Sequence, residues 1–292
     1  MEKEYAALMI DLKGSQKYPD DQRQEIQIYW NKVVNILNKI FRQDMVFKVN
    51  FSGGDQVQGL FYTPEAAYLY YRLFSMCTHP FQTHGGIGIG TCNIQLGSKK
   101  HTGGQDGKAY HRARAASDLA DADIGYPILF NSGEIYCDRD RIINSLIGMA
   151  ALIALRHTAH QNQIMLITEI LYPISDECIH MEHDALLEKQ YELLRLKHKF
   201  DLKYAERKNN VLPIEHLIRN NENSFVDVNI RKAAKTKNPI NYVTEGKGRG
   251  IPKTLEEVLG IKYQSINTTL KAADIFNIRN LSIAALEEMR RI

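Results

Sequence analysis

The segment VNFSGGDQVQGLF (residues 49–61) constrains the fold more than any other part of the sequence. Apolar and polar residues alternate on both sides of a glycine pair, which is typical of two strands joined by a tight turn. Glycine permits positive φ angles at such a turn and lets the backbone approach another group closely. We therefore expect a β-hairpin that carries Asp55 at or near its tip, followed by the neutral Gln56.

The segments around this hairpin predict a mixed fold. The run YAALMI (5–10) is typical of a strand buried on both faces, and the apolar spacing over 20–41 predicts a helix. After the hairpin we expect a helix from Thr63 and Pro64 to Cys77, a strand over 85–92, a helix over 106–122 and a strand over 126–130. This βαββαβ order plus one strand indicates an α+β fold, ferredoxin-like, with helices on one face of the sheet.

The chain divides into three regions on these patterns. Residues 1–135 contain the expected sheet, and residues 136–230 are mostly helical with few strand signals. Residues 231–292 begin with a basic linker, in which the stretch 231–253 holds seven Lys or Arg against one Glu, and end in further helices.

Charge and composition limit the classes of protein. A net charge of +3 over 292 residues is too small to mark the whole chain as a nucleic-acid binder, so any such surface must be local. Four well-separated cysteines fit reduced thiols better than a disulfide framework. The N-terminus lacks a signal-peptide pattern, and the apolar run 146–155 is about half of a bilayer span. We expect a cytoplasmic protein without a membrane partner.

Two aspartates carry the predicted chemistry. Asp11 ends the first strand and Asp55 lies at the hairpin turn, so we expect the two carboxylates to meet at one edge of the sheet. Together with the backbone carbonyl of Leu12 they suit a hard divalent cation, Mg²⁺ or Mn²⁺. Gly14 and Ser15, in the turn after the strand, offer backbone N–H groups where a triphosphate would lie.

Four segments in this order resemble a known family: LMIDLKGSQKY, FSGGDQVQGLF, GGIGIGTC and GGQDGKAYHRARAA. They resemble the SatD family of bacterial proteins. More remotely they resemble the palm domain of class III nucleotidyl cyclases, GGDEF diguanylate cyclases and the CRISPR polymerase-like subunit. The resemblance covers about residues 1–135 and implies a nucleotide-cyclase-like palm. Asp11 and Asp55 would be its catalytic metal ligands, Gly54 would lie at the nucleotide, and Arg114 would contact the nucleotide across a homodimer interface.

Three positions differ from the catalytic members of those families. Tyr110 stands where a nucleotide-contacting Asn is expected, and Phe51 stands where a lysine selects adenine. Gln56 replaces the acidic residue that follows the second aspartate. These differences remove a metal-ligand candidate and a base reader, and they favour metal-dependent nucleotide binding over cyclisation.

The C-terminal segment LEEVLGIKYQSINTTLKAA (255–273) has the rhythm of a helix-turn-helix. The expected DNA-facing residues of its second helix are Tyr263, Gln264, Ser265, Asn267, Thr268 and Lys271. The basic stretch 231–253 would then hold DNA phosphates. The same rhythm also fits a small helical hairpin used for dimerisation or packing.

The glycine turn, Arg114 and the histidine pair can each also be explained by a purely structural role. The Gly-Gly-Asp turn could be only a turn, and Arg114 could belong to a solvated helix face. His157 and His160 have metal-ligand spacing, but without an acidic or cysteine third ligand we expect surface histidines. Two hypotheses therefore remain. One is a regulator that senses a nucleoside triphosphate or other nucleotide and binds DNA, and the other is a metal-dependent nucleotidyl cyclase or nucleotidyl-transfer enzyme.

Overall fold

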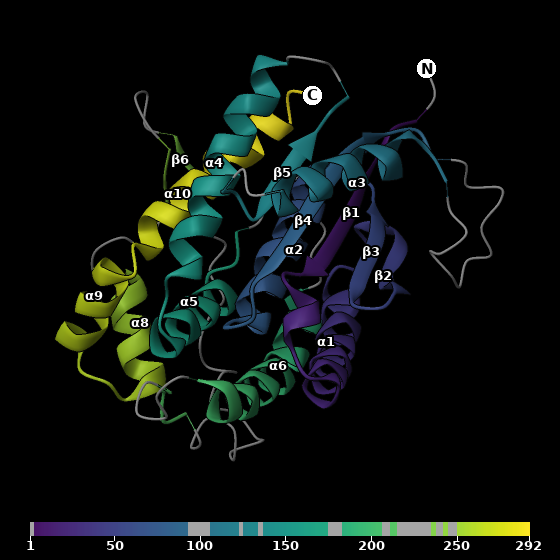
Figure 1. The fold of residues 1–292 in the computed structure, drawn as a ribbon. Coiled ribbons are helices and arrows are strands. Elements are labelled where there is room, and N and C mark those ends of the chain that lie inside the picture. The colour runs from purple at the N-terminus through teal and green to yellow at the C-terminus, as the bar shows by residue number, and fades with distance from the viewer. Residues whose placement is uncertain are drawn as a thin grey trace.

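The computed structural model describes residues 3–92, 106–122, 125–133, 137–174, 183–205, 211–214, 235–237, 242–244 and 250–292. Its centre is a five-stranded sheet of order β2-β3-β1-β4-β5, with helices packed around it (Figure 1). The strands are β1 Tyr5–Leu12, β2 Met45–Gly53, β3 Gln56–Phe61, β4 Thr83–Gly90 and β5 Ile128–Asn131. The helices up to residue 204 are η1 Ser15–Lys17, α1 Asp20–Ile40, α2 Pro64–Thr78, α3 Lys108–Asp121, α4 Asp138–Leu155, α5 Ala159–Leu171 and α6 His183–Tyr204.

The predicted α+β fold is confirmed, including the order of its elements. Strand β1 pairs antiparallel with both β3 and β4, which is the ferredoxin-like arrangement, and β5 adds parallel to β4. Thr63 caps α2 as expected, because its Oγ1 accepts a hydrogen bond from the Ala66 N–H at 3.3 Å.

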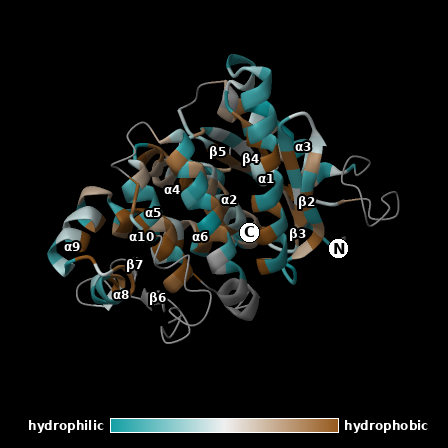
Figure 2. Ribbon diagram, turned by 90° about the horizontal axis from the view of Figure 1, so that it is seen from below, coloured by the Kyte–Doolittle hydropathy of each residue, from teal (hydrophilic) through white to brown (hydrophobic). Residues whose placement is uncertain are grey.

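Helices cover both faces of the sheet, which corrects the expectation of one covered face. Leu8, Ile10 and Val57 pack under α1 and α2 in the main core. Met9 and Leu60 point to the opposite face and pack under α3. The apolar residues of α1 alternate with polar ones along the helix, as the colours of Figure 2 show, and most of the apolar ones are buried, together with the polar Asn38.

The handedness of one connection explains this difference. The connections through α2 and α3 both join parallel strands and step across the sheet in the same direction, yet their helices lie on opposite faces. The two connections therefore have opposite hands, whereas about 98% of such crossovers are right-handed. Glycines on one side of β4 allow the unusual packing, because a Cβ at Gly88 would lie 2.1 Å from the Ala113 nitrogen of α3.

A bulge in β2 changes which residues share a face. The register with β3 shifts between Phe47 and Asn50, so Phe47 packs on the α3 side and Val49 packs in the main core. The side chain of Asn38 on α1 pairs with both backbone groups of Val49, at 2.8 Å to its carbonyl and 3.2 Å to its N–H. The expected simple alternation of the hairpin therefore holds for β3 but not for β2.

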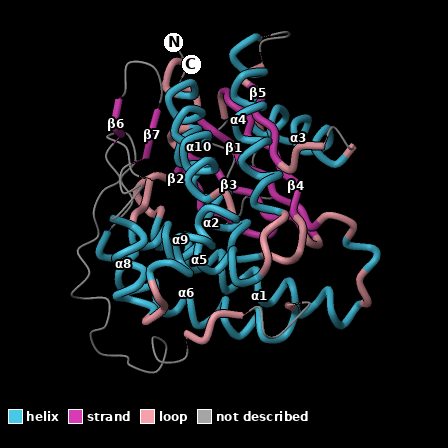
Figure 3. The backbone as a smooth tube through the Cα atoms, turned by 90° about the vertical axis from the view of Figure 1, so that its left-hand side faces the viewer, coloured by secondary structure: helices cyan, strands magenta, loops and turns pink. Residues whose placement is uncertain are grey.

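The C-terminal helices join the same core as the sheet. They are α8 Gly250–Leu259, α9 Tyr263–Ala272 and α10 Ile275–Met289. A two-stranded hairpin, β6 Lys235–Lys237 and β7 Tyr242–Thr244, lies apart from the main sheet (Figure 3). Arg279 of α10 is fully buried and contacts Glu169 at 2.8 Å, and Glu169 also contacts Arg72 of α2 at 2.8 Å. Helix α10 is thus built into the body of the molecule.

Candidate functional site

The tip of the β2–β3 hairpin presents Asp55 as predicted. Gly53 pairs with Gln56, and Gly54 adopts a positive φ of 56°, which glycine tolerates without strain. The carbonyl of Gly54 accepts a hydrogen bond from Gln27 of α1 at 3.2 Å, which ties the tip to the body. Asp55 Oδ2 is buried and has no hydrogen-bond partner among the described residues. A buried carboxylate oxygen without a partner is energetically unfavourable unless a cation or ligand satisfies it.

Asp11 lies at the end of β1 beside this tip. It is opposite His84 on β4. The β1–β3 pairing ends at Ile10 and Val57, which are the chain neighbours of Asp11 and Gln56. Strand alternation puts Asp11 on the same face as Met9, toward α3. One of its oxygens, Oδ1, accepts a hydrogen bond from the Leu12 N–H at 2.8 Å. The fold therefore brings Asp11 and the Asp55 turn to neighbouring positions at one edge of the sheet.

The turn after β1 is tight and is closed by backbone hydrogen bonds. Gly14 is left-handed with a φ of 65° and precedes the short helix η1. Its carbonyl accepts a hydrogen bond from Lys17 at 2.9 Å, and the next residue, Ser15, accepts one from Tyr18 at 3.2 Å. The Tyr18 ring packs edge-on against Phe81 with centroids 5.3 Å apart, which anchors the end of the loop.

A cavity of about 310 Å³ lies on the α3 face of the sheet. Its strand wall consists of Met9, Ser52, Gln56 and Gln58. Its other wall comes from α3 and the residue before it, namely Asp106, Tyr110, His111 and Arg114. The cavity adjoins the hairpin tip through Ser52 and Gln56, and Asp11 and Asp55 are not among the residues that line it.

Two arginines of α3 have different roles. Arg112 donates from Nη1 to the carbonyl oxygens of Ile89 and Ser132, at 2.5 and 2.7 Å, and so ties α3 to the two strands beneath it. Arg114 is exposed, lines the cavity and forms no hydrogen bond or ion pair with any described residue. His111 Nε2 and Asp106 Oδ1 lie 2.8 Å apart, and both side chains are largely exposed.

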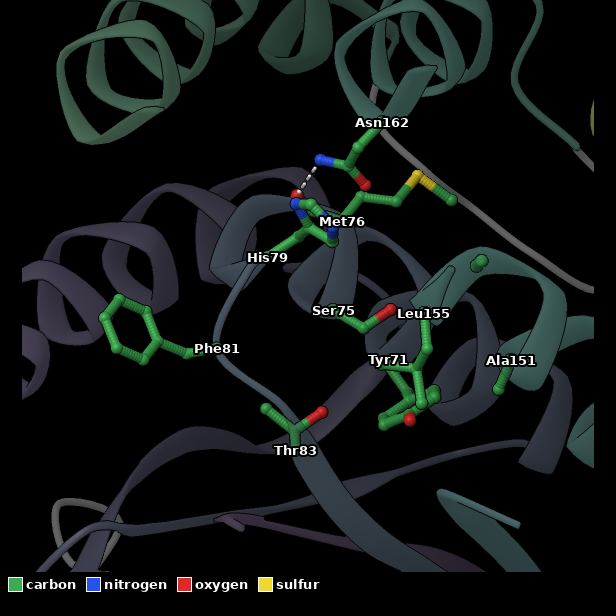
Figure 4. Close-up of a pocket in the computed structure, with 10 residues that line it drawn as sticks. Tyr71, Ser75, Met76, His79, Phe81, Thr83, Ala151, Leu155 and Asn162 are labelled. Atoms are coloured by element: carbon green, nitrogen blue, oxygen red, sulfur yellow. Dashed lines mark hydrogen bonds between the residues drawn. The ribbon is translucent and has the colours of Figure 1, made fainter. Parts of the chain in front are cut away.

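A second cavity, between α2, α4 and α5, is too small for a nucleotide. It has a volume of about 20 Å³, enough for about one water molecule. Figure 4 shows Tyr71, Ser75 and Thr83 around it, and the Asn162 amide that donates to the Met76 carbonyl at 2.8 Å. This hydrogen bond satisfies a carbonyl at the end of α2, which indicates a structural role.

A family model, described as the SatD family, matches residues 5–193. The chain belongs to the SatD family. Two solved structures, each titled as a bacterial light-regulated adenylyl cyclase, are similar to 44% of this chain at 22% identity. One has a TM-score of 0.30 with 74% of its own chain covered, and the other 0.29 with 42% covered. The search of curated proteins finds no match. Among the described residues, no helix is long and apolar enough to cross a membrane.

The SatD match extends past the sheet into the helical region. It includes α4, α5 and part of α6, which is more than the 1–135 of the expected resemblance, and it ends before α8. The C-terminal helices α8 to α10 of this SatD protein therefore lie beyond the matched segment. Helices α8 and α9 lie on the opposite side of the molecule from the β2–β3 hairpin, whereas α10 runs from them across the body of the molecule (Figures 1 and 2).

The C-terminal segment forms two helices joined by a short turn, as predicted. Gly260 takes a positive φ of 65° between them. Glu256 Oε1 accepts a hydrogen bond from the Tyr263 N–H at 2.9 Å, so this carboxylate satisfies the start of α9. Of the residues expected to face DNA, Gln264, Ser265, Thr268 and Lys271 are exposed, whereas Tyr263 and Asn267 are half-buried. Most of the basic stretch 231–253 lies outside the described residues.

Buried hydrogen bonds attach α8 and α9 to the helical region. His157 is buried, and its Nε2 lies 2.7 Å from the carbonyl of Ala273 at the end of α9. Tyr172 Oη lies 2.6 Å from Thr254 Oγ1 on α8. The expectation of a surface histidine is therefore wrong for His157, whose pKa burial lowers. His157 lies in the turn between α4 and α5, and His160 lies in the first turn of α5. No sequence signal indicates that Ala273 is the partner of His157.

Proposed function

We propose that this SatD family protein binds a nucleoside triphosphate together with Mg²⁺ or Mn²⁺ at the hairpin tip and acts as a nucleotide-responsive regulator. The observation that carries the proposal is Asp55 Oδ2, which is buried without a hydrogen-bond partner in the part of the chain that the structure describes, beside the strand end that holds Asp11. A divalent cation would satisfy that oxygen, and oxygen ligands of this kind suit Mg²⁺. Asp11, Asp55 and the Leu12 carbonyl are the residues that would hold it.

The proposed metal ligands, Asp11, Asp55 and the Leu12 carbonyl, are enough for one divalent cation but not for two. Across the described residues there is no group of three or more His, Cys, Asp or Glu side chains that could hold a metal. Gln56, next to Asp55, adds no negative charge and is a weak ligand for Mg²⁺. Two-metal chemistry needs ligands for both ions, so this set favours binding over cyclisation.

The phosphates of the nucleotide would be held by backbone and arginine. Gly14 and Ser15 supply the tight loop, Gly54 allows close approach at the tip, and Arg114 supplies an exposed cation on the adjoining cavity. Arg114 and the hairpin residues Ser52 and Gln56 of the same chain line one cavity. The resemblance to cyclases places the arginine across a homodimer interface, and a homodimer remains our expectation, which light scattering tests at micromolar concentration.

The output of the regulator would be DNA binding by α9. The exposed Gln264, Ser265, Thr268 and Lys271 would face the groove, with Tyr263 and Asn267 at the edge of the contact. The basic stretch 231–253 would add phosphate contacts and a strong dependence on salt. A fluorescence-anisotropy titration with duplex DNA at two salt concentrations tests this part separately.

A second candidate is a metal-dependent nucleotidyl cyclase or other nucleotidyl-transfer enzyme. The retained pair of Asp11 and Asp55, with Arg114 at the cavity, favours it. Incubation of the pure protein with each NTP and Mg²⁺ or Mn²⁺, followed by product analysis, separates the two candidates. Rapid turnover would make the enzyme the better description.

The test of binding compares Asp55→Asn with the parent protein by calorimetry. We expect Asp55→Asn to lose Mg²⁺-dependent NTP affinity while its unfolding transition is unchanged, because the turn depends on the positive φ of Gly54 rather than on the charge. Asp118→Asn on the exposed side of α3 is the matched control and should bind normally. If Asp55→Asn binds NTP as tightly as the parent, the metal site is not at this tip.

A further inference from the structure

We propose that the cavity beside α3 holds the base of the bound nucleotide, with Gln58 as the residue that sets base affinity and with purines preferred to pyrimidines. This inference rests on the proposed function, because it takes the phosphates and the metal to lie at the hairpin tip. It goes further in assigning the base to particular residues of this chain.

The position whose lysine selects adenine in the cyclases that this chain resembles cannot recognise a base in this chain. Phe51 stands at that position, and it packs against the main core on the side of α1 and α2. Its side chain therefore lies on the face of the sheet opposite to the cavity. Any reading of the base by this chain needs other residues, and the cavity provides them.

The strand register orders the cavity from the tip inward. Asp11 and Gln56 lie at the tip, Met9 faces Gln58 one step further in, and the next pair, with Leu60, packs under α3. A ligand whose phosphates meet Asp11 and Asp55 at the tip would extend past Gln58. The base end of a nucleotide thus coincides with the buried part of the cavity.

The chemistry of the walls suits a neutral heteroaromatic ring. Gln58 is only 5% exposed, and its amide can both donate and accept hydrogen bonds. Ser52 donates to Gln56 Oε1 at 3.0 Å, which orients the Gln56 amide and leaves its N–H groups for a ligand. Tyr110 and Met9 add apolar surface, and burial raises the pKa of Tyr110, so its phenol stays neutral. A base can stack on such a ring and bond to the amides at its edge.

The size of the cavity also favours a base. A volume of about 310 Å³ lies at the lower end of the range for small-molecule sites, about 300–1,000 Å³. Stacking strength grows with ring area, so the two-ring purines should bind more tightly than the one-ring pyrimidines. Arg114 supplies an exposed guanidinium on the lining, and this cation would meet the anionic part of the ligand.

The test separates the base from the phosphates by using inorganic tripolyphosphate as a probe. Calorimetry on the full chain with Mg²⁺ would compare tripolyphosphate with ATP, GTP, CTP and UTP. We expect ATP or GTP to bind at least about tenfold more tightly than tripolyphosphate, because the base adds both stacking and hydrogen bonds to the buried Gln58 amide. Gln58→Leu should remove most of that difference and leave tripolyphosphate affinity within about twofold of the parent.

Two further variants keep the result interpretable. Ser52→Ala lies on the hairpin surface and should weaken NTP but not tripolyphosphate, because it releases the Gln56 amide. Gln43→Leu, at an exposed position in the turn between α1 and β2, is the control for a Gln-to-Leu change and should leave all affinities unchanged. Circular dichroism checks that each variant is folded.

The possible outcomes are distinct. If NTPs bind no more tightly than tripolyphosphate, or if folded Gln58→Leu and Ser52→Ala keep the full preference for NTPs, base reading by this cavity is wrong while metal–phosphate binding stands. Tighter binding of pyrimidines would overturn the stacking argument. If neither tripolyphosphate nor any NTP binds with Mg²⁺ or Mn²⁺, the proposed function fails and the inference fails with it.

Discussion

The two faces of the same sheet differ in what their side chains do. On the face toward α1 and α2, Leu8, Ile10 and Val57 are completely buried in one apolar core. On the face toward α3, the same two strands present Gln56 and Gln58 to a cavity of about 310 Å³. Because successive side chains of a strand alternate between faces, one short sequence serves both purposes. The closed face stabilises the fold, and the open face is where a ligand has room.

The use of charge shows the same contrast. Beside the closed face, Glu169 contacts Arg72 and Arg279 at 2.8 Å each, and all three side chains are buried. On the open face, Arg114 forms no hydrogen bond or ion pair with the described residues. A buried charge without its partner is strongly destabilising, whereas an exposed one is not. Mutations on the two sides should therefore separate stability from binding.

The largest expected effect is on the closed side. Glu169→Gln leaves two buried guanidinium groups without a carboxylate, and we expect a loss of about 3–5 kcal/mol in the free energy of unfolding. Urea denaturation measures it. The exposed Glu257→Gln is the matched control, with an expected change within about 0.5 kcal/mol. A loss below about 1 kcal/mol for Glu169→Gln would mean that the triad is not a stabilising feature.

The same variant predicts a pH dependence. Burial alone would raise the pKa of Glu169, but Arg279 and Arg72 outweigh it and hold the pKa below its ordinary value of 4.5. Because the folded pKa is lowered, the contribution to stability is present above pH 4.5 and is lost as the pH falls through the folded pKa. The difference in unfolding free energy between parent and Glu169→Gln should therefore shrink in acid. A difference that is constant from neutral pH into acid would contradict this assignment.

The next effect concerns the helix that forms one wall of the open face. An alanine Cβ at Gly88 would lie 2.1 Å from the Ala113 nitrogen, so Gly88→Ala must push α3 away from β4. We expect a loss of about 1–3 kcal/mol in unfolding free energy and weaker nucleotide binding, because the cavity wall moves. Gly53→Ala at the hairpin meets no atom within 4 Å and should change stability by less than about 0.5 kcal/mol. Equal effects of the two substitutions would remove the argument for close packing of α3.

Much of the fold follows from local patterns in the sequence, and the exceptions have physical causes. Local patterns predict β1, α1, the hairpin and α2 closely. The apolar run of β1 is buried on both faces, the periodic residues of α1 form one buried stripe, and Thr63 caps α2. The face taken by α3 does not follow from element order, since its crossover has the opposite hand to the other two. The glycines at 86 and 88 of β4, which lie on one side of the strand, were the available signal for a close helix.

The site is predictable in its parts but not in its surroundings. The sequence indicates Asp55 at a turn and Asp11 at a strand end, and the sheet order then makes them neighbours. That Arg114 shares a cavity with Gln58 depends on where α3 crosses the sheet, which no local pattern reveals. Long-range contacts, such as the bond between His157 and Ala273, are equally invisible in a local sequence pattern.

A smaller effect is expected at the tip itself. Gln56→Glu adds a carboxylate next to Asp55 and near Asp11, and like charges this close repel. Without metal we expect a loss of less than about 1 kcal/mol in unfolding free energy, and Mg²⁺ should restore it because the new oxygen provides a further ligand. The measurement is the rise in melting temperature on adding Mg²⁺, which should be larger for Gln56→Glu than for the parent. If Mg²⁺ stabilises both proteins equally, Gln56 does not limit metal binding, and the argument for a single well-bound ion loses its basis.

The smallest effect on stability should come from Arg114→Ala, on the open face. Its guanidinium is exposed and has no bonding partner among the described residues, so we expect a change within about 0.5 kcal/mol. Affinity for Mg²⁺-tripolyphosphate should nevertheless fall, because a charge-assisted contact to phosphate is lost. Arg112→Ala is the informative counterpart, since it removes the bonds to Ile89 and Ser132 and should lower stability more than Arg114→Ala does. Stability changes of equal size at the two arginines would show that the open face contributes to folding as the closed face does, and the division between the two faces would not hold.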